Sequence, residues 1–475
     1  MSYKSPAPGR PGIEPRWARG NKDGIGTAYS ADSRLWFTLW NGIVTEVYYP
    51  TVDRPQLRDL QYLVTDGEGF FHEEKRNTDH TIRKLASHAL GYQITNSDPK
   101  GRYVITKEVI SDPHLPSLLQ NTRFTSRMGA GKLELFALCA PHLEVGGWGN
   151  SASVEEISGR RIFVAHKRST WMAMGASAPF DKMSCGYVGT SDGWMDTSSD
   201  YRMDWEYDVA PDGNVALTAQ LDPSREFTLG LSFGETIHQA AAALFQSLST
   251  PFEVQRRKFL EQWERSTRGI LPLHKHSVHE KDLYHSSYGL ILAHEDKSYP
   301  GAIIASLSIP WGETRSDDDQ GGYHLVWTRD LVQAALGLLA AGDSITPLRA
   351  LVYLAVSQLA NGGFPQNFWI DGTPYWRGVQ LDEASFPIIL AWKLREAGAL
   401  GDFDPYSMVM NAAAFIVNYG PATQQDRWGR WVELAVHAGV QHSCALLCSR
   451  LCNGKGRRAN SRIPSGVFRL PGGSC

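Results

Sequence analysis

The chain of 475 residues contains no apolar run that approaches the roughly 18 residues needed to cross a bilayer. Its first residues, MSYKSPAPGRPG, lack the apolar core of a secretory signal peptide. Only Cys139 and Cys185 precede residue 444, so the body of the chain has no disulfide framework. These absences predict a cytoplasmic location and no membrane partner.

Several common signatures of catalytic and metal sites are also missing. The sequence has no glycine-rich phosphate loop and no G-x-S-x-G turn. Cys444, Cys448 and Cys452 are spaced as on a helix rather than as the C-x₂-C of a zinc site. The three aspartates at 317–319 lack the Asp/Gly alternation of a calcium loop and indicate an exposed acidic loop. The sequence therefore predicts neither a metal nor a cofactor.

The sequence also lacks an excess of either charge, because 47 basic and 50 acidic residues give a net charge of −3. This balance argues against a nucleic-acid partner and favours polar recognition of a neutral ligand. Hydrophobic residues make up 42% of the chain, enough for sizeable cores. The 15 tryptophans suit either those cores or the flat faces of pyranose rings.

The order of residue patterns predicts a multidomain β plus α protein. β-branched and aromatic runs separated by turn residues predict an antiparallel sandwich, with strands at 35–40, 43–52, 103–110, 132–140 and 161–167. Apolar residues at helical spacing follow, at 235–248, 251–266, 281–295, 330–342, 346–360, 383–398 and 407–420. We expect a β domain over 1–232, a helical linker over 233–280, a helical domain over 281–428 and an aberrant tail over 429–475.

The segment VWTRD, residues 326–330, places an arginine and a carboxylate just before a predicted helix. Asp330 can serve simply as the N-cap, with Gln333 completing a capping box. Alternatively, Arg329 and Asp330 together hold vicinal sugar hydroxyls through charge-assisted hydrogen bonds. The spacing alone leaves both interpretations open.

The segment WRGVQLDE, residues 376–383, is the second polar and aromatic cluster. It is either a solvated loop with Ser385 capping the next helix, or one wall of a ligand site. Apolar neighbours and mutual repulsion would raise the pKa of the adjacent Asp382 and Glu383, as a general acid requires. On residue chemistry alone, Glu383 is the candidate acid.

Taken together and in order, these segments resemble the bacterial-type glucoamylases and glucodextranases of glycoside hydrolase family 15. The resemblance extends from about residue 10 to Trp428 and also includes LWFTLWNGIVTEVYYPTVDRPQLRDLQYL, ASLSIPWGE, GGFPQN and QQDRW. It implies an N-terminal antiparallel β-supersandwich, a helical linker and a partial (α/α)₆ barrel. It also implies exo-acting, inverting release of glucose from the non-reducing ends of α-glucans or oligosaccharides.

The resemblance also assigns substrate-binding roles. Arg329 and Asp330 would hold the terminal glucose beside Trp327. The residues that would line the pocket are Trp376, Gln380, Asp382 and Glu383, with Arg427 and Trp428 from the last matching motif. The family's general acid is the first Glu of an R-W-E-E motif, but here Gly429 and Arg430 follow Trp428.

Catalysis by this chain is therefore in doubt. The family places its general base about two hundred residues beyond the acid, and the chain has no such segment. Each positioned acid or base is worth about 10²–10⁴ in rate. We therefore expect this chain to lack both catalytic carboxylates and to be inactive. The alternatives are a non-catalytic oligosaccharide-binding pseudoenzyme, a trehalase or a disaccharide phosphorylase.

The tail itself is unusual, since no Asp or Glu follows Glu433 in 42 residues, while six Lys or Arg and four of the six cysteines do. Codons shifted forward by one nucleotide after Trp428 permit a glutamate next. Further along, over 435–447, they permit P-[YS]-T-L-A-x-[NS]-I-A-A-L, a stretch similar to the one that follows R-W-E-E in the family. The pattern predicts a frameshift after Trp428 and a premature stop after Cys475. The nucleotide sequence tests this, because a single-frame gene without a family match in the alternate frame contradicts it.

Overall fold

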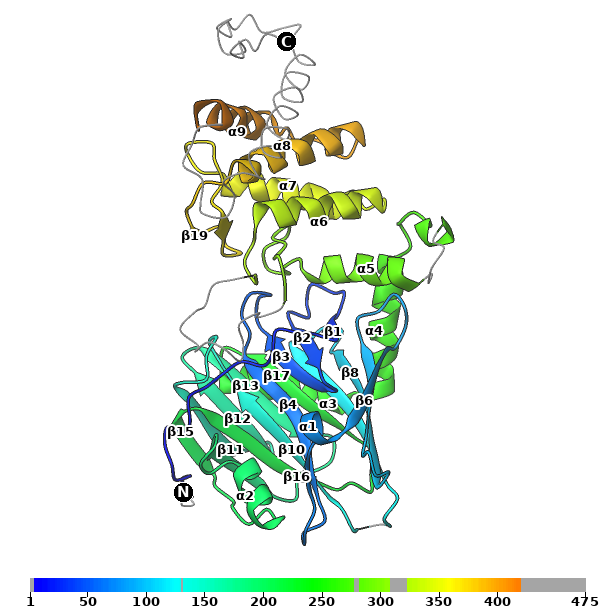
Figure 1. Ribbon diagram of the computed structural model, residues 1–475, viewed down its shortest axis with the longest axis vertical. Helices are drawn as coiled ribbons and strands as arrows, with labels where there is room; N and C mark the ends of the chain where they lie inside the picture. The colour runs from blue at the N-terminus through cyan, green and yellow to red at the C-terminus, as the bar shows by residue number, and fades with distance from the viewer. Residues whose placement is uncertain (1–3, 130, 277–281, 308–322, 420–475) are drawn as a thin grey trace, which may run out of the picture.

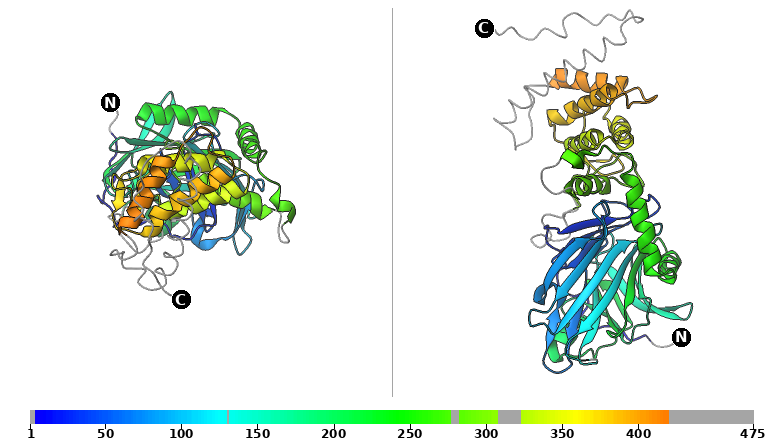
Figure 2. Two further views of the ribbon diagram at one scale, coloured as in Figure 1. Left: turned by 90° about the horizontal axis from the view of Figure 1, so that it is seen from above. Right: turned by 90° about the vertical axis from the view of Figure 1, so that its right-hand side faces the viewer.

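The computed structural model describes residues 4–129, 131–276, 282–307 and 323–419. The strand-rich first part of the chain forms two antiparallel sheets at one end of an elongated molecule (Figure 1). The helices of residues 328–419 follow one another in layers at the other end (Figure 2). The predicted order, a β sandwich followed by helices, is confirmed.

Within the described residues, the first sheet has eight strands in the order β1-β2-β3-β4-β10-β16-β14, with β5 paired to β4. Its strands are β1 (Gly24–Thr27), β2 (Trp36–Trp40), β3 (Ile43–Tyr48), β4 (Leu57–Thr65), β5 (Phe71–Glu73), β10 (Glu134–Pro141), β14 (Met183–Tyr187) and β16 (Val215–Leu221).

The second sheet has nine strands over the same part of the chain, in the order β15-β11-β12-β13-β17-β9-β8-β7-β6. Its strands are β6 (Asp79–Lys84), β7 (Tyr92–Ser97), β8 (Tyr103–Ser111), β9 (Ser117–Ser126), β11 (Asn150–Ile157), β12 (Arg160–Lys167), β13 (Thr170–Ala176), β15 (Val209–Gly213) and β17 (Phe227–Gly234).

The alternation of side chains explains why these strands pair face to face. Buried and partly exposed residues alternate strictly along β7 and along the first six residues of β8. One face therefore joins the common core, where Phe37, Tyr62, Tyr103 and Phe163 are buried. Each of the five strands predicted from composition is present, at β2, β3, β8, β10 and β12.

Helices lie outside and beyond the sandwich. They are α1 (Glu74–Asn77), α2 (Gly193–Asp200), α3 (Ile237–Ser249), α4 (Phe252–Ser266), the 3₁₀ helix η1 (Leu273–His276), α5 (Asp282–Ala293), α6 (Thr328–Ala340), α7 (Ile345–Ser357), α8 (Leu381–Glu396) and α9 (Tyr406–Tyr419). A short hairpin of β18 (Asn367–Phe368) and β19 (Pro374–Trp376) separates α7 from α8. All seven helices predicted from periodicity are present.

The upper helices share a core that reaches into the sandwich. Leu331, Leu351 and Ile388, from α6, α7 and α8, lie in one buried cluster with Trp36 and Tyr48 of the first sheet. The Tyr48 hydroxyl donates to the Leu307 carbonyl at 2.6 Å. Apolar burial and this hydrogen bond both fix the helices onto the strand ends.

Three consecutive charged residues after α5 form the main polar contacts of this junction. Glu295 accepts from Arg349 Nε and Nη2 at 2.8 and 2.6 Å, within the helical part. Asp296 is 2% exposed, and its Oδ2 accepts from Val52 N at 2.8 Å. The Lys297 ammonium donates to Thr27 Oγ1 and to the carbonyls of Ala28 and Ser33, at 2.7, 2.8 and 2.5 Å.

Several sequence predictions concern domain boundaries or residues outside the described ranges. The boundaries of the domains remain predictions, and the tail from 429 to 475 lies outside the described residues, as do the aspartates at 317–319. Cys139 and Cys185 are buried free thiols. In the parts of the chain that the structure describes, no helix has both the length and the apolar character that a membrane span requires.

Replacing Asp296 by alanine is expected to lower the free energy of unfolding by roughly 2–4 kcal/mol, because the N–H groups of Val52, Ser298 and Tyr299 lose their acceptor. Urea unfolding measures the change, and Asp296→Asn, which keeps one oxygen, is expected to lose less. The control is Asp402→Ala at an exposed position, expected to change stability by less than about 0.5 kcal/mol. Equal loss in both alanine variants would contradict this role for Asp296.

Candidate functional site

Three segments far apart in the sequence form the candidate site. They are the start of α6, the β18–β19 hairpin and the start of α8. Val326 and Phe368 exchange backbone hydrogen bonds at 2.9 and 3.0 Å, which holds the hairpin beside the start of α6. We call the side chains of Trp327, Arg329, Trp376, Gln380 and Asp382, together with Glu383, the Arg329 cluster.

Arg329 is the centre of this cluster. Its Nη1 forms an ion pair with Asp382 Oδ2 and donates to Gln380 Oε1 at 3.3 Å. The Asp382 side chain is 7% exposed, whereas that of Arg329 is 31% exposed. The guanidinium therefore fixes a nearly buried carboxylate while keeping part of its own surface accessible. The structure brings together Arg329, Gln380 and Asp382, as the sequence predicted.

Glu383 lies beneath this ion pair. It is fully buried, and its Oε2 accepts from the backbone N of Arg329 at 2.7 Å. Burial, followed by the negative charge of Asp382, raises the pKa of Glu383 to about 8, although Arg329 opposes this. The predicted rise in pKa is confirmed for Glu383. Its buried position and its bond to the main chain of α6 fit a positioning role better than proton donation to a ligand.

Both helices begin earlier than the sequence indicated, so the two predicted N-caps are wrong. The α6 helix starts at Thr328 with Trp327 as N-cap, which places Asp330 inside the first turn. Similarly, α8 starts at Leu381, and the Ser385 hydroxyl donates to the Leu381 carbonyl at 2.9 Å rather than capping the helix. The reason is tertiary, since the Glu383 carboxyl accepts an N–H of the first turn of α6 that a local cap would otherwise satisfy.

Asp330 does not join the ion pair. The residue is exposed, and its pKa is raised by partial burial of the carboxyl, with Arg329 acting in the opposite direction. It follows Arg329 on the same helical turn, where its charge also favours the N-terminus of α6. The exposed position of Asp330 is compatible with contact to a ligand hydroxyl.

Aromatic rings border the cluster. Trp327 and Trp376 meet edge to face, with ring centroids 5.7 Å apart and planes at 86°. Trp327 is 9% exposed, but Trp376 is 46% exposed, and Tyr375 lies 5.7 Å from it. Trp327 thus belongs to the core edge, while Trp376 presents an accessible ring.

Sequence reasoning missed two polar residues, Gln366 and Asn367, at positions 5% and 0% exposed. Asn367 Oδ1 accepts from Trp376 N at 3.0 Å. Among the described residues, Gln366 Oε1 and Asn367 Nδ2 are buried polar atoms without a hydrogen-bond partner, as are Thr328 Oγ1 and Glu383 Oε1. Buried polar groups are seldom left unpaired, and Glu383 Oε1 lies 3.7 Å from Arg329 Nη1 in a salt bridge. The segment GGFPQN, which contains both residues, is the sequence pattern that could have identified them.

Arg427 and Trp428, the remaining predicted site residues, lie outside the described residues. Over the described ranges, no group of three His, Cys, Asp or Glu side chains is arranged to hold a metal ion. The chemistry of the Arg329 cluster is that of a charged hydrogen-bonding pair beside an exposed indole. Such a set suits hydroxyl groups and the apolar face of a sugar ring.

Comparisons with known proteins identify relatives of this chain. A family model described as glucodextranase, domain N, matches residues 7–267, and one described as glycosyl hydrolases family 15 matches residues 278–362. A glucoamylase from Clostridium sp. (strain G0005) is 37% identical over 422 residues, which are 88% of this chain and 59% of that protein.

The crystal structure of a bacterial glucoamylase complexed with acarbose is similar to this chain with a TM-score of 0.86 and 33% identity. The match covers 95% of this chain and 69% of that one. It confirms the predicted fold class, an N-terminal β-supersandwich followed by part of an (α/α)₆ barrel.

The raised pKa of Glu383 generates a pH-dependent prediction. The folded state binds this proton more tightly than the unfolded chain, so the stabilisation is complete below about pH 4.5 and is lost as the pH rises through about 8. Glu383→Gln removes the titration but retains an acceptor for Arg329 N. The wild type should therefore lose roughly 3–5 kcal/mol relative to this variant between those limits.

Urea unfolding of both proteins at pH 5 and pH 8.5 measures the difference. Glu396→Gln, on the exposed side of α8, is the matched control and should follow the wild type at both pH values. If the Glu383→Gln and wild-type stabilities run parallel with pH, Glu383 is not a buried neutral carboxyl.

Proposed function

The chain belongs to the glycosyl hydrolases of family 15, and from that premise we propose that its Arg329 cluster binds the terminal glucose of an α-glucan or oligosaccharide. The observation that carries this proposal is the Arg329–Asp382 ion pair beside the exposed ring of Trp376. A related bacterial glucoamylase has been crystallised with acarbose, which supports a sugar as the ligand.

Each group has a distinct part in binding. Arg329 supplies N–H donors and Asp382 supplies acceptor oxygens, so together they can hold neighbouring hydroxyl groups through charge-assisted hydrogen bonds. Trp376 offers an indole face to the apolar side of the ring. Asp330, which is exposed, can accept from a further hydroxyl. Gln380 accepts from Arg329 Nη1 and so orients the guanidinium. This contact leaves the other nitrogen atoms of the guanidinium to a ligand.

The reaction of glucoamylase type is an exo-acting, inverting hydrolysis. It requires one carboxylic acid and one carboxylate about 6.5–9.5 Å apart, with a water molecule between them. Neither carboxyl of the QLDE segment is suited to it, because Asp382 is bound to Arg329 and Glu383 is buried against the main chain. Gly429 and Arg430 follow Trp428, where the family has its acid. We therefore propose that the chain in the sequence given binds sugar without useful turnover.

Binding and turnover are tested side by side. Titration with maltose and isomaltose by calorimetry should show a binding event that Arg329→Ala weakens by at least about tenfold, because charge-assisted hydrogen bonds contribute about 1.5–3 kcal/mol each. Lys393→Ala, which removes an exposed cation of helix α8, should bind as the wild type does. Glucose release should be at least about 10²-fold below the rate of an intact relative assayed in parallel.

Two results would overturn parts of this proposal separately. Release of β-glucose at the relative's rate would show that the chain carries a working acid and base. Unchanged maltose affinity in both Arg329→Ala and Trp376→Ala would show that the Arg329 cluster is not the sugar site.

A further inference from the structure

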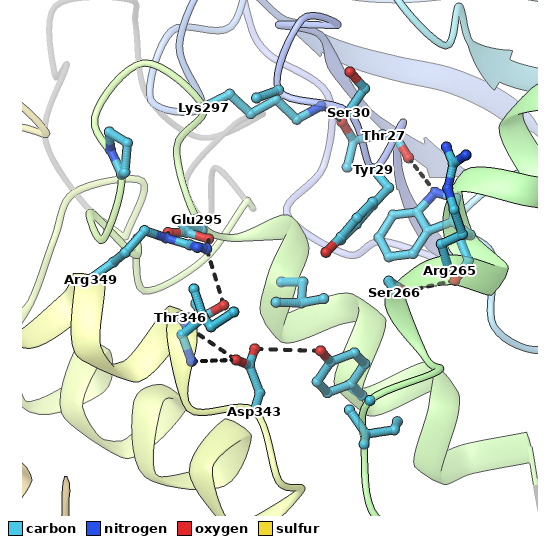
Figure 3. Close-up of a pocket in the computed structure, with 18 of the residues that line it drawn as sticks. Thr27, Tyr29, Ser30, Arg265, Ser266, Glu295, Lys297, Asp343, Thr346 and Arg349 are labelled. Carbon is cyan, nitrogen blue, oxygen red and sulfur yellow. Dashed lines mark hydrogen bonds and ion pairs between the residues drawn. The ribbon is translucent and has the colours of Figure 1, made fainter. Parts of the chain in front are cut away.

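A cavity of about 720 Å³ lies at the junction of the sandwich and the helices, away from the Arg329 cluster (Figure 3). Its walls come from the loop between β1 and β2, the end of α4, the segment after α5 and the loop between α6 and α7. Its volume is within the range of about 300–1,000 Å³ that is usual for ligand pockets. No part of it is used by the proposed function.

One wall is aromatic. Tyr29 is 45% exposed, and its ring lies 5.6 Å from that of the buried Trp263. The Trp263 indole is itself fixed by donation to the Thr27 carbonyl at 3.0 Å. Figure 3 shows the Tyr29 hydroxyl directed into the cavity, toward the side occupied by Glu295 and Asp343. The tyrosine therefore combines a supported flat face with a polar group at the centre of the site.

The cavity is lined by charges of both signs in equal number. Acidic groups come from Glu295, Asp296 and Asp343, and basic groups from Arg265, Lys297 and Arg349. The pKa of Tyr29 is raised, first by burial and then by Asp343, while Arg349 and Arg265 act in the opposite direction. The hydroxyl thus stands between carboxylates and guanidinium groups.

Several of these groups retain hydrogen-bonding capacity. Asp343 Oδ1 accepts from Ile345 N and Thr346 N at 2.9 and 3.1 Å, but its Oδ2 has only a long contact of 3.4 Å from Tyr288. Arg349 uses Nε and Nη2 for Glu295 and Thr346, which leaves the Nη1 donors for a ligand. Acceptors and donors therefore lie on the same side of the aromatic face.

We propose that this cavity is a second carbohydrate site, which binds a neutral oligosaccharide of the glucan type on the Tyr29 ring. An aromatic face with alternating donors and acceptors suits a ring that bears several hydroxyl groups. The equal numbers of carboxylates and cations disfavour a strongly charged ligand, because either sign of charge would face like charges. The location of this second site is inferred from the cavity alone, whereas the class of its ligand rests on the proposed function.

The position of the cavity gives binding a further consequence. A ligand there contacts Tyr29 of the sandwich and also Asp343 and Arg349 of the helical part. Since these groups belong to the two sides of the junction, a bound oligosaccharide would connect them. Any ligand that binds only the folded state raises its stability, so maltotriose should raise the melting temperature through this site.

The test uses maltotriose and the complete chain of 475 residues. Calorimetry should show two equivalents bound by the wild type, one by Tyr29→Ala, one by Arg329→Ala and none by the double variant. Tyr29→Phe keeps the ring and is expected to bind within about threefold of the wild type, whereas Asp343→Asn should weaken the junction site by about tenfold. In the Arg329→Ala background, maltotriose should raise the melting temperature, and Tyr29→Ala should abolish that shift.

The outcomes separate the two sites. If Arg329→Ala loses one bound equivalent of maltotriose but neither Tyr29→Ala nor Asp343→Asn does, this inference is overturned. The proposed function would then still stand. Loss in the Tyr29 and Asp343 variants alone would support the junction site and overturn the proposed function. In the Arg329→Ala background, glucose 1-phosphate should bind at least about tenfold more weakly than maltose. Equal affinity would overturn the choice of a neutral ligand.

Discussion

Two adjacent charged side chains, Asp296 and Lys297, hold the helical part on the sandwich, while the preceding Glu295 binds Arg349 within the helical part. Each reaches a different partner, so consecutive residues connect α7, the segment after β3 and the β1–β2 loop. Buried charges of this kind stabilise only when fully hydrogen-bonded. Burial lowers the pKa of Lys297 to about 7, yet three oxygen acceptors and the Trp36 ring at 4.8 Å surround its ammonium group.

The buried charges of the Arg329 cluster are likewise stabilised by ion pairs and hydrogen bonds. Two neighbouring carboxyls at the start of α8 would repel each other if both were ionised in a buried place. Arg329 pairs with Asp382, and Glu383, whose pKa is raised by burial, satisfies the main chain of α6 instead. The start of each helix is thereby fixed by the other. In the proposed binding, a ligand would meet a pre-positioned arginine and carboxylate, which lowers the entropic cost of binding.

The parts of this structure that depend on periodicity could be predicted from the sequence. Strands and helices were found because burial repeats every two or every 3.6 residues. The start of α6 was missed because Glu383, distant in sequence, accepts an N–H of its first turn in place of a local cap. The polar residues Gln366 and Asn367 belong to no periodic pattern. The charges of residues 295–297 were missed because charged residues after a helix usually face solvent, whereas here Asp296 is 2% exposed.

The proposed sugar binding and bond cleavage place separate demands on this architecture. Arg329, Asp382 and Trp376 are positioned by the first helices of the barrel and one hairpin. Hydrolysis additionally needs an acid and a base on opposite sides of the scissile bond. The sequence has Gly429 rather than a glutamate after Trp428, whereas the Arg329–Asp382 ion pair forms between α6 and α8. The proposed binding therefore depends on residues other than those that the catalytic motif supplies.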